Sequence, residues 1–185
     1  MGWKHSVVDT DLVLNHQEEP VIITLTKNPY SFLLSLYKRP YHYKGNKPNS
    51  FLSFLKEKWE LTGRDNYKLR SLDSPINLWN IKNRSYIDLS DSYSNYLIIT
   101  YEELLERPDK VIASISEKLN IPLKDVFRNY DNSTKDDNKD FNDYQSYYLN
   151  ELWKKELDND EVIFINSKLD LNVLSHFGYE IYRKK

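Results

Sequence analysis

Two short apolar segments, each rich in β-branched residues, constrain the fold of this chain more than any other feature. They are Val21–Thr26 (VIITLT) and Tyr96–Tyr101 (YLIITY). Neither alternates apolar with polar side chains, which is typical of a strand buried on both faces of a parallel sheet. Trp3–Val8 is a weaker candidate for a third strand. Helical patterns lie between the two strong segments, and this order predicts an α/β fold with right-handed crossovers.

The expected helices carry recognisable start and stop signals. Asn28 can cap a helix whose first residue is Pro29 and which should end near Pro40. Gly178 is placed to stop the last helix. The polar segment Asp131–Asp143 predicts a mobile surface loop, and residues 1–185 are expected to form a single domain. Further helices are expected over Ser50–Leu61, Asn77–Leu89 and Lys110–Leu119. Tyr144–Leu157 and Asp158–Phe177 are expected to form two or three helices that close the domain.

Composition excludes several classes of protein. With 26 Lys and Arg against 28 Asp and Glu, the net charge is -2, which argues against nucleic acid as a partner. The absence of Cys removes disulfides, thiolate zinc sites and cysteine nucleophiles. His16, His42 and His176 are isolated and lack the spacing of metal ligands, so no metal site is expected. No apolar segment approaches the length of about 20 residues that spans a membrane, and the first residues lack a signal-peptide core, so a cytoplasmic location is expected.

The four glycines also exclude familiar nucleotide sites, because no two are spaced to form GxxxxGK[ST] or GxGxxG. A bias toward Lys, Asn, Ile and Tyr indicates an AT-rich genome, such as that of a phage or a marine microbe.

A candidate anion site follows the first strand. The strand ends at Lys27, and the helix that begins at Pro29 offers free amides and a dipole that favour an anion. Ser35 and Arg39 lie four residues apart, on one face of that helix, where both could reach the same phosphate. The alternative is that Lys27 is a solvated charge, Ser35 a packing residue and Arg39 a cation at the helix end.

This segment, KNPYSFLLSLY, resembles the 3′-phosphate-binding motif of sulfotransferases that use 3′-phosphoadenosine-5′-phosphosulfate (PAPS). Lys27 and Ser35 hold the spacing of that motif, although the family more often has Arg at the first position. Tyr96–Ile121 and Leu169–Glu180 are similar to later family segments. The resemblance implies a P-loop NTPase-like three-layer fold, with a short parallel sheet flanked by helices. It also implies PAPS as co-substrate, with no metal.

The amino-terminal GWKHS is similar to the family's catalytic strand end. The resemblance implies that His5 is the general base toward a hydroxyl or amine acceptor and that Lys4 stabilises charge on the transferring group. Apart from the family, His5 is a residue near a chain end with a structural role or none.

The family's 5′-phosphosulfate loop has no counterpart, because no Pro-Lys/Arg-Ser-Gly-Thr-like string occurs in the 185 residues. We therefore expect an N-terminally truncated fold, and whether the chain is an enzyme stays open. Three explanations fit the missing loop. The reading frame was begun at an internal Met, the loop is supplied by another chain, or the protein is a reduced relative that no longer transfers sulfate. The alternative function is thus a nucleotide-binding or interaction module. A homo-oligomer would cover the exposed sheet edge.

Other residues favour structural roles. Glu102 and Glu103 match a strand-to-helix turn, and Trp79 is a core filler rather than a platform for adenine. Lys135 and Lys139 lie among aspartates and indicate a solvated loop.

Overall fold

The structure is a computed structural model that describes residues 6–41, 43–44, 47–61, 68–131 and 138–184. Its central feature is a parallel pair of strands, β1 (Ile22–Thr26) and β4 (Tyr96–Thr100), paired from Ile22 with Tyr96 to Thr26 with Thr100. A small antiparallel pair joins β2 (Trp59–Glu60) to β3 (Ser71–Leu72). The helices are α1 (Thr10–Leu14), α2 (Pro29–Lys38), α3 (Phe51–Lys56), α4 (Pro75–Ser90), α5 (Tyr101–Glu106), α6 (Pro108–Leu119), α7 (Phe141–Leu149), the 3₁₀ helix η1 (Leu152–Glu156), α8 (Asn159–Asn166) and α9 (Leu171–His176).

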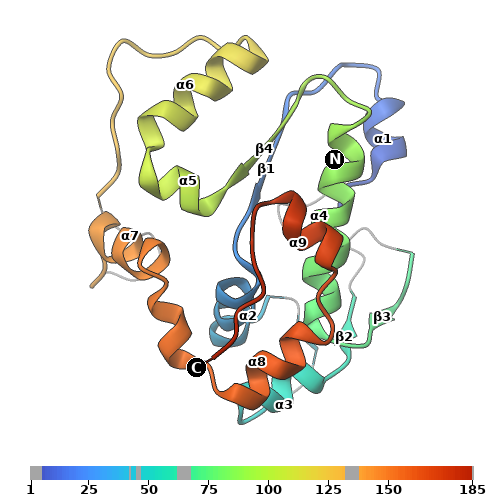
Figure 1. Ribbon diagram of the computed structural model, residues 1–185. Coiled ribbons are helices and arrows are strands. Elements are labelled where there is room, and N and C mark those ends of the chain that lie inside the picture. Colours follow the sequence, from blue (N-terminus) through green and yellow to red (C-terminus); the bar gives the residue numbers. More distant parts are fainter. Residues whose placement is uncertain (1–5, 42, 45–46, 62–67, 132–137, 185) are drawn as a thin grey trace.

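Helices lie on both sides of the parallel pair. In Figure 1, β1 and β4 run alongside each other between α4 on one side and α5 and α6 on the other. The chain is therefore an α/β protein with a short parallel sheet flanked by helices, consistent with a P-loop-like fold.

The burial of β1 differs from the prediction. One face carries Ile22, Thr24 and Thr26 and packs toward α4. On the opposite face Ile23 and Leu25 are 42% and 47% exposed. The expectation of a strand buried on both faces is wrong for β1, because α6 packs against β4 and leaves this face of β1 open.

The start of α2 is confirmed. The side chain of Asn28 accepts a hydrogen bond from the Tyr30 N–H at 3.1 Å, and Pro29 is the first helical residue, where its fixed φ suits the helix and its missing N–H costs nothing. The helix ends at Lys38, before Pro40. The helices predicted over Asn77–Leu89 and Lys110–Leu119 correspond to α4 and α6.

Two further expectations are corrected. The helix predicted over Ser50–Leu61 ends at Lys56, and Trp59 instead enters β2, where its ring packs against those of Tyr41 and Tyr43. Burial of this large ring in an extended segment outweighs the helical periodicity. No third strand forms over Ser6–Val8, the described part of the Trp3–Val8 candidate.

The polar loop predicted over Asp131–Asp143 is shorter at its carboxyl end. Asp140 caps α7 through reciprocal bonds with Asp143, so the helix begins at Phe141. Residues 132–137, with Lys135, lie outside the described residues.

The carboxyl-terminal segment closes the fold through α8 and α9. Gly178 follows α9 with φ +70°, a left-handed conformation that glycine adopts without strain. The N–H groups of Gly178 and Tyr179 donate to the carbonyls of Ser175 and Leu174, which is the Schellman stop expected of this glycine.

Two hydrophobic clusters hold these elements together. The larger one lies among α2, α3, α4, η1, α8 and α9 and contains the fully buried rings of Trp59, Trp79 and Trp153. The smaller one joins Val13, Leu89 and Tyr96 beneath the parallel pair. Within the described ranges, no helix combines the length and the apolar character needed to cross a membrane.

Candidate functional site

The predicted pair Lys27 and Ser35 comes into direct contact. Lys27 follows the last residue of β1, and Ser35 lies in the second turn of α2. The Lys27 Nζ donates to Ser35 Oγ at 2.7 Å, and that hydroxyl donates to the Ser31 carbonyl at 2.9 Å. A strand that turns directly into a helix therefore brings a cation and a hydroxyl to the carboxyl end of the parallel pair, although they are separated by eight positions.

The backbone around Lys27 is held by α4. The buried indole Nε1 of Trp79 donates to the Lys27 carbonyl at 3.0 Å. One helical turn further along α4, Asn83 accepts a hydrogen bond from the hydroxyl of Thr26. Trp79 is a core residue as expected, and its polar atom also fixes the end of β1.

The turn is also held from α5. Glu102 accepts from the Asn28 N–H at 3.0 Å and from the Tyr179 hydroxyl at 2.8 Å, while Glu103 completes a capping box with Thr100. Burial, together with the charge of Glu102, raises the pKa of Tyr179 above its ordinary value, so the phenol stays protonated as a donor. Both glutamates have the structural role expected of them.

These bonds change the predicted basis of anion binding. The Asn28 N–H is bonded to Glu102, Pro29 has none, and the Tyr30 N–H is bonded to the Asn28 side chain. The expectation of free helix amides is therefore wrong for these positions, because the protein satisfies them itself. The groups that can bind an anion at this site are therefore the side chains of Lys27 and Ser35 rather than these backbone amides.

Sequence reasoning missed Tyr148, which α7 brings to the pair. Lys27 Nζ donates to the Tyr148 hydroxyl at 3.1 Å and lies 4.7 Å from the centre of its ring. The Tyr101 ring meets the Tyr148 ring edge to face at 4.9 Å, and burial raises the pKa of Tyr101, with a smaller contribution from Tyr148. More than a hundred residues separate Tyr148 from Ser35, and neither periodicity nor a motif in the sequence identified it.

The other predicted site residues are placed differently. Arg39 caps the carboxyl end of α2, where its N–H donates to the Ser35 carbonyl at 3.0 Å and its side chain is exposed. Its backbone has left the helical conformation, so the one-turn spacing from Ser35 does not align the two side chains as on a regular helix. Lys4 and His5 lie outside the described residues.

A polar groove of about 700 Å³ begins two residues after His5. One wall is the segment from Val7 to Asp11, which the Val8 N–H fixes to Ser85 of α4 at 3.1 Å. The other wall includes the ion pair of Arg84 with Asp170, 2.7 Å apart, in which Arg84 holds the pKa of Asp170 below its usual value although burial opposes this shift. Helix α4 thus contacts the Lys27 turn through Trp79 and Asn83 and lines the groove through Arg84.

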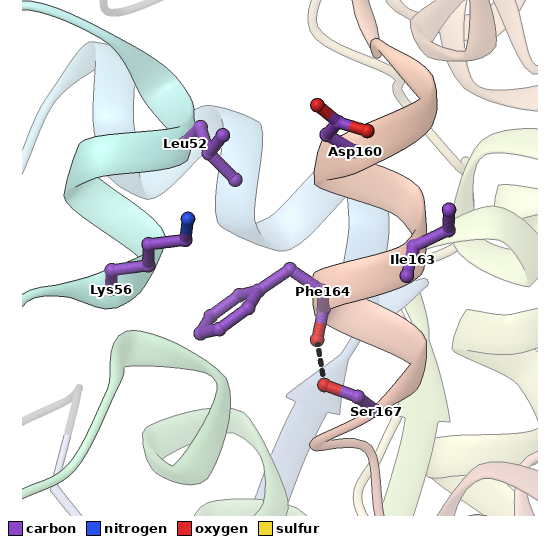
Figure 2. Close-up of a pocket in the computed structure, with 6 residues that line it drawn as sticks. All are labelled: Leu52, Lys56, Asp160, Ile163, Phe164 and Ser167. Atoms are coloured by element: carbon purple, nitrogen blue, oxygen red, sulfur yellow. Dashed lines mark hydrogen bonds between the residues drawn. The ribbon is translucent and has the colours of Figure 1, made fainter.

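A second hollow, of about 260 Å³, lies between α3 and α8 (Figure 2). Its wall combines Lys56 with Phe164, whose ring centre lies 5.6 Å from the Lys56 Nζ. Neither Lys27 nor Ser35 lines it, so it is separate from the candidate site. Among the residues with described positions, no three histidine, aspartate or glutamate side chains are grouped to hold a metal ion.

Fold and site together define the class of protein: an α/β protein with a lysine and a serine in contact where a parallel strand turns into a helix. The chain belongs to the sulfotransferase domain family, whose model matches residues 12–170. No curated protein and no solved structure matches it. The chemistry of this family is sulfuryl transfer, which requires a sulfuryl donor with a nucleotide and an acceptor.

Proposed function

We propose that this chain binds the nucleotide of PAPS, with Lys27 and Ser35 as ligands of the 3′-phosphate. The observation that carries the proposal is the 2.7 Å contact between Lys27 Nζ and Ser35 Oγ at the end of a parallel strand. An ammonium beside a hydroxyl can share one phosphate oxygen, and hydrogen bonds that involve charge are about twice as strong as neutral ones. Both residues are half-buried, so a ligand can reach them while part of the water is excluded.

As an enzyme, the protein would move a sulfuryl group to a hydroxyl or amine. The acceptor oxygen or nitrogen forms a bond to sulfur while the bond from sulfur to the bridging phosphate oxygen breaks. His5 takes the acceptor proton, Lys4 stabilises the negative charge on the transferring or leaving oxygens, and adenosine 3′,5′-bisphosphate leaves. The groove that begins at Val7 has the volume of a small-molecule site and supports binding of an acceptor there.

A second candidate function is a nucleotide-binding module without transfer chemistry. It is supported by the contact of Lys27 with Ser35, which by itself provides anion binding and no transfer chemistry. Both proposals require the same 3′-phosphate site. They differ in whether a sulfuryl group is transferred after the nucleotide binds.

Calorimetric titration with adenosine 3′,5′-bisphosphate tests the shared site. We expect binding by the wild-type chain and a loss of affinity of about tenfold or more in Lys27→Ala and Ser35→Ala, because each removes a ligand to a charged group. Lys56→Ala and Ser53→Ala make the same changes on α3, outside the site, and should bind as the wild type does.

Absence of binding by the wild-type chain, or equal losses in the α3 variants, would overturn the proposal. Sulfuryl transfer from PAPS to an acceptor, abolished by His5→Ala, would favour the enzyme over the module. Nucleotide binding without such transfer would favour the module.

A further inference from the structure

The hydroxyl of Tyr148 completes a triangle of polar atoms with the candidate site. Its oxygen lies 3.1 Å from Lys27 Nζ and 3.4 Å from Ser35 Oγ, and those two atoms are 2.7 Å apart. Three atoms this close together can all contact one oxygen of a bound anion. Since Tyr148 lies on α7 and the other two belong to the β1–α2 unit, the triangle exists only in the folded chain.

The distribution of protons within the triangle identifies its available donor. Lys27 donates to both hydroxyl oxygens, and Ser35 donates its single hydrogen to the Ser31 carbonyl. Tyr148 therefore accepts from Lys27 and keeps its own hydrogen to donate. The acceptor found for that hydrogen among the described residues is Ser35 Oγ, and 3.4 Å is long for an O–H···O bond. An anion oxygen would be a better acceptor.

The neighbouring side chains fix the direction of this hydroxyl. The rings of Tyr101 and Tyr147 meet the Tyr148 ring edge to face, each at 4.9 Å, and the Tyr144 ring is stacked on it at 6.5 Å. The α7 helix is joined to α5 by Gln145, whose Nε2 donates to the Leu105 carbonyl at 2.9 Å. A donor held in this way binds an anion without first being ordered.

We infer that Tyr148 is a third ligand of the anion, donating its hydroxyl hydrogen to the phosphate monoester that Lys27 and Ser35 bind. The inference rests on the proposed function and adds a specificity role: the Lys27 ammonium and the Tyr148 phenol, both beside the Ser35 hydroxyl, distinguish a nucleotide with a 3′-phosphate from one with a 3′-hydroxyl. No bond is made or broken at Tyr148.

Titration of Tyr148→Phe with adenosine 3′,5′-bisphosphate and with AMP tests this role. The Phe variant keeps the ring and loses the hydroxyl, so we expect its affinity for the bisphosphate to fall about tenfold while its affinity for AMP stays within about twofold of wild type. Tyr147→Phe is the matched control, because its hydroxyl donates to Glu156 at 2.6 Å, outside the triangle. It should leave the preference for the bisphosphate unchanged, and thermal melts of both variants check that the fold is intact.

The outcomes separate this inference from the proposed function. If the wild type binds the bisphosphate and Lys27→Ala does not, unchanged binding by Tyr148→Phe overturns the inference alone. A parallel loss of AMP affinity in Tyr148→Phe also overturns it, because the ring or the fold would then be responsible. If the wild type binds no bisphosphate, the proposed function fails and the inference fails with it.

Discussion

The position of Lys27 is set by hydrogen bonds that residues of α4 and α5 make to its backbone and to that of the next residue. The Lys27 carbonyl accepts from the Trp79 indole, and the N–H of Asn28 donates to Glu102, so both polar groups of the peptide bond that follows Lys27 are held before any ligand arrives. This matters because lysine is a flexible point charge without the rigid fork of arginine. A fixed backbone, together with acceptors on Ser35 and Tyr148, gives the ammonium a defined position.

Trp79→Phe should weaken nucleotide binding without touching the ligand. The change leaves the Lys27 carbonyl without its indole donor and lets the end of β1 shift. We expect affinity for adenosine 3′,5′-bisphosphate to fall about fivefold, and the free energy of unfolding to fall by about 1–3 kcal/mol. Calorimetry and urea unfolding measure the two effects.

Trp59→Phe is the control for the lost ring volume. Trp59 is as deeply buried as Trp79, and within the described ranges its Nε1 has no acceptor. This variant should lose stability but keep its nucleotide affinity. Equal affinity losses in the two variants would mean that the indole bond does not position Lys27.

The same residues explain how much of the site could be predicted from the sequence. Lys27 and Ser35 belong to one strand–turn–helix unit, so their proximity follows from local geometry and the Asn28 cap. Tyr148 reaches them from α7 through packing across the whole fold, and a sequence of many tyrosines gives no reason to single it out. The hydrogen bond that the Asn28 N–H donates to Glu102, which removes this amide from the anion site, is likewise a tertiary contact.

Among the helices and strands, β1 differs from its prediction because one of its faces is exposed. The two parallel strands, α2 and α4 could be predicted because their patterns are local. The burial of β1 could not, because it depends on what lies beside it. One edge pairs with β4, and on the open face Val21, Ile23 and Leu25 present an apolar row without a charge. Edge strands normally carry a charge, a proline or a bulge that prevents pairing with another chain.

The open apolar face of this edge strand predicts self-association. We expect sedimentation velocity to show an average mass that rises with concentration, and Ile23→Lys to shift the population toward monomer by placing a charge in the apolar row. Ile163→Lys makes the same substitution at an exposed site on α8 and should not change the mass distribution. A wild-type chain that stays monomeric throughout, or an equal effect of the two variants, would contradict this prediction.

For the molecule as a whole, Tyr30 joins α2 to the carboxyl-terminal segments. It is the second residue of α2, next to the candidate site, and its ring stacks on Trp153 with centres 5.4 Å apart. Its hydroxyl donates to the side chain of Asn166 and accepts from the Tyr182 N–H at 2.9 Å. One buried phenol thus connects α2 with η1, α8 and the carboxyl-terminal segment, and the site rests on the larger hydrophobic cluster through it.

The free energy of unfolding depends on pH through the protonation of Tyr30. Burial raises the pKa of Tyr30 to about 12, against a smaller opposing effect of the Tyr182 N–H, whereas an unfolded tyrosine has a pKa of 10.0. Between these values the unfolded chain loses the proton and the folded chain keeps it. Stability is therefore fully retained below about pH 10 and falls as the pH rises toward 12, by about 1.4 kcal/mol per pH unit from this group.

Urea unfolding of the wild type and Tyr30→Phe between about pH 9 and 12 measures that contribution. The variant should be less stable at neutral pH by about 1–3 kcal/mol, because Asn166 and the Tyr182 N–H lose their partner. Its alkaline decline should be shallower than that of the wild type, since one titrating phenol has been removed while the other buried tyrosines still ionise on unfolding. Parallel pH profiles would show that Tyr30 ionises as readily in the folded chain as in the unfolded one, and that the phenol joining α2 to the carboxyl-terminal segments is reached by solvent.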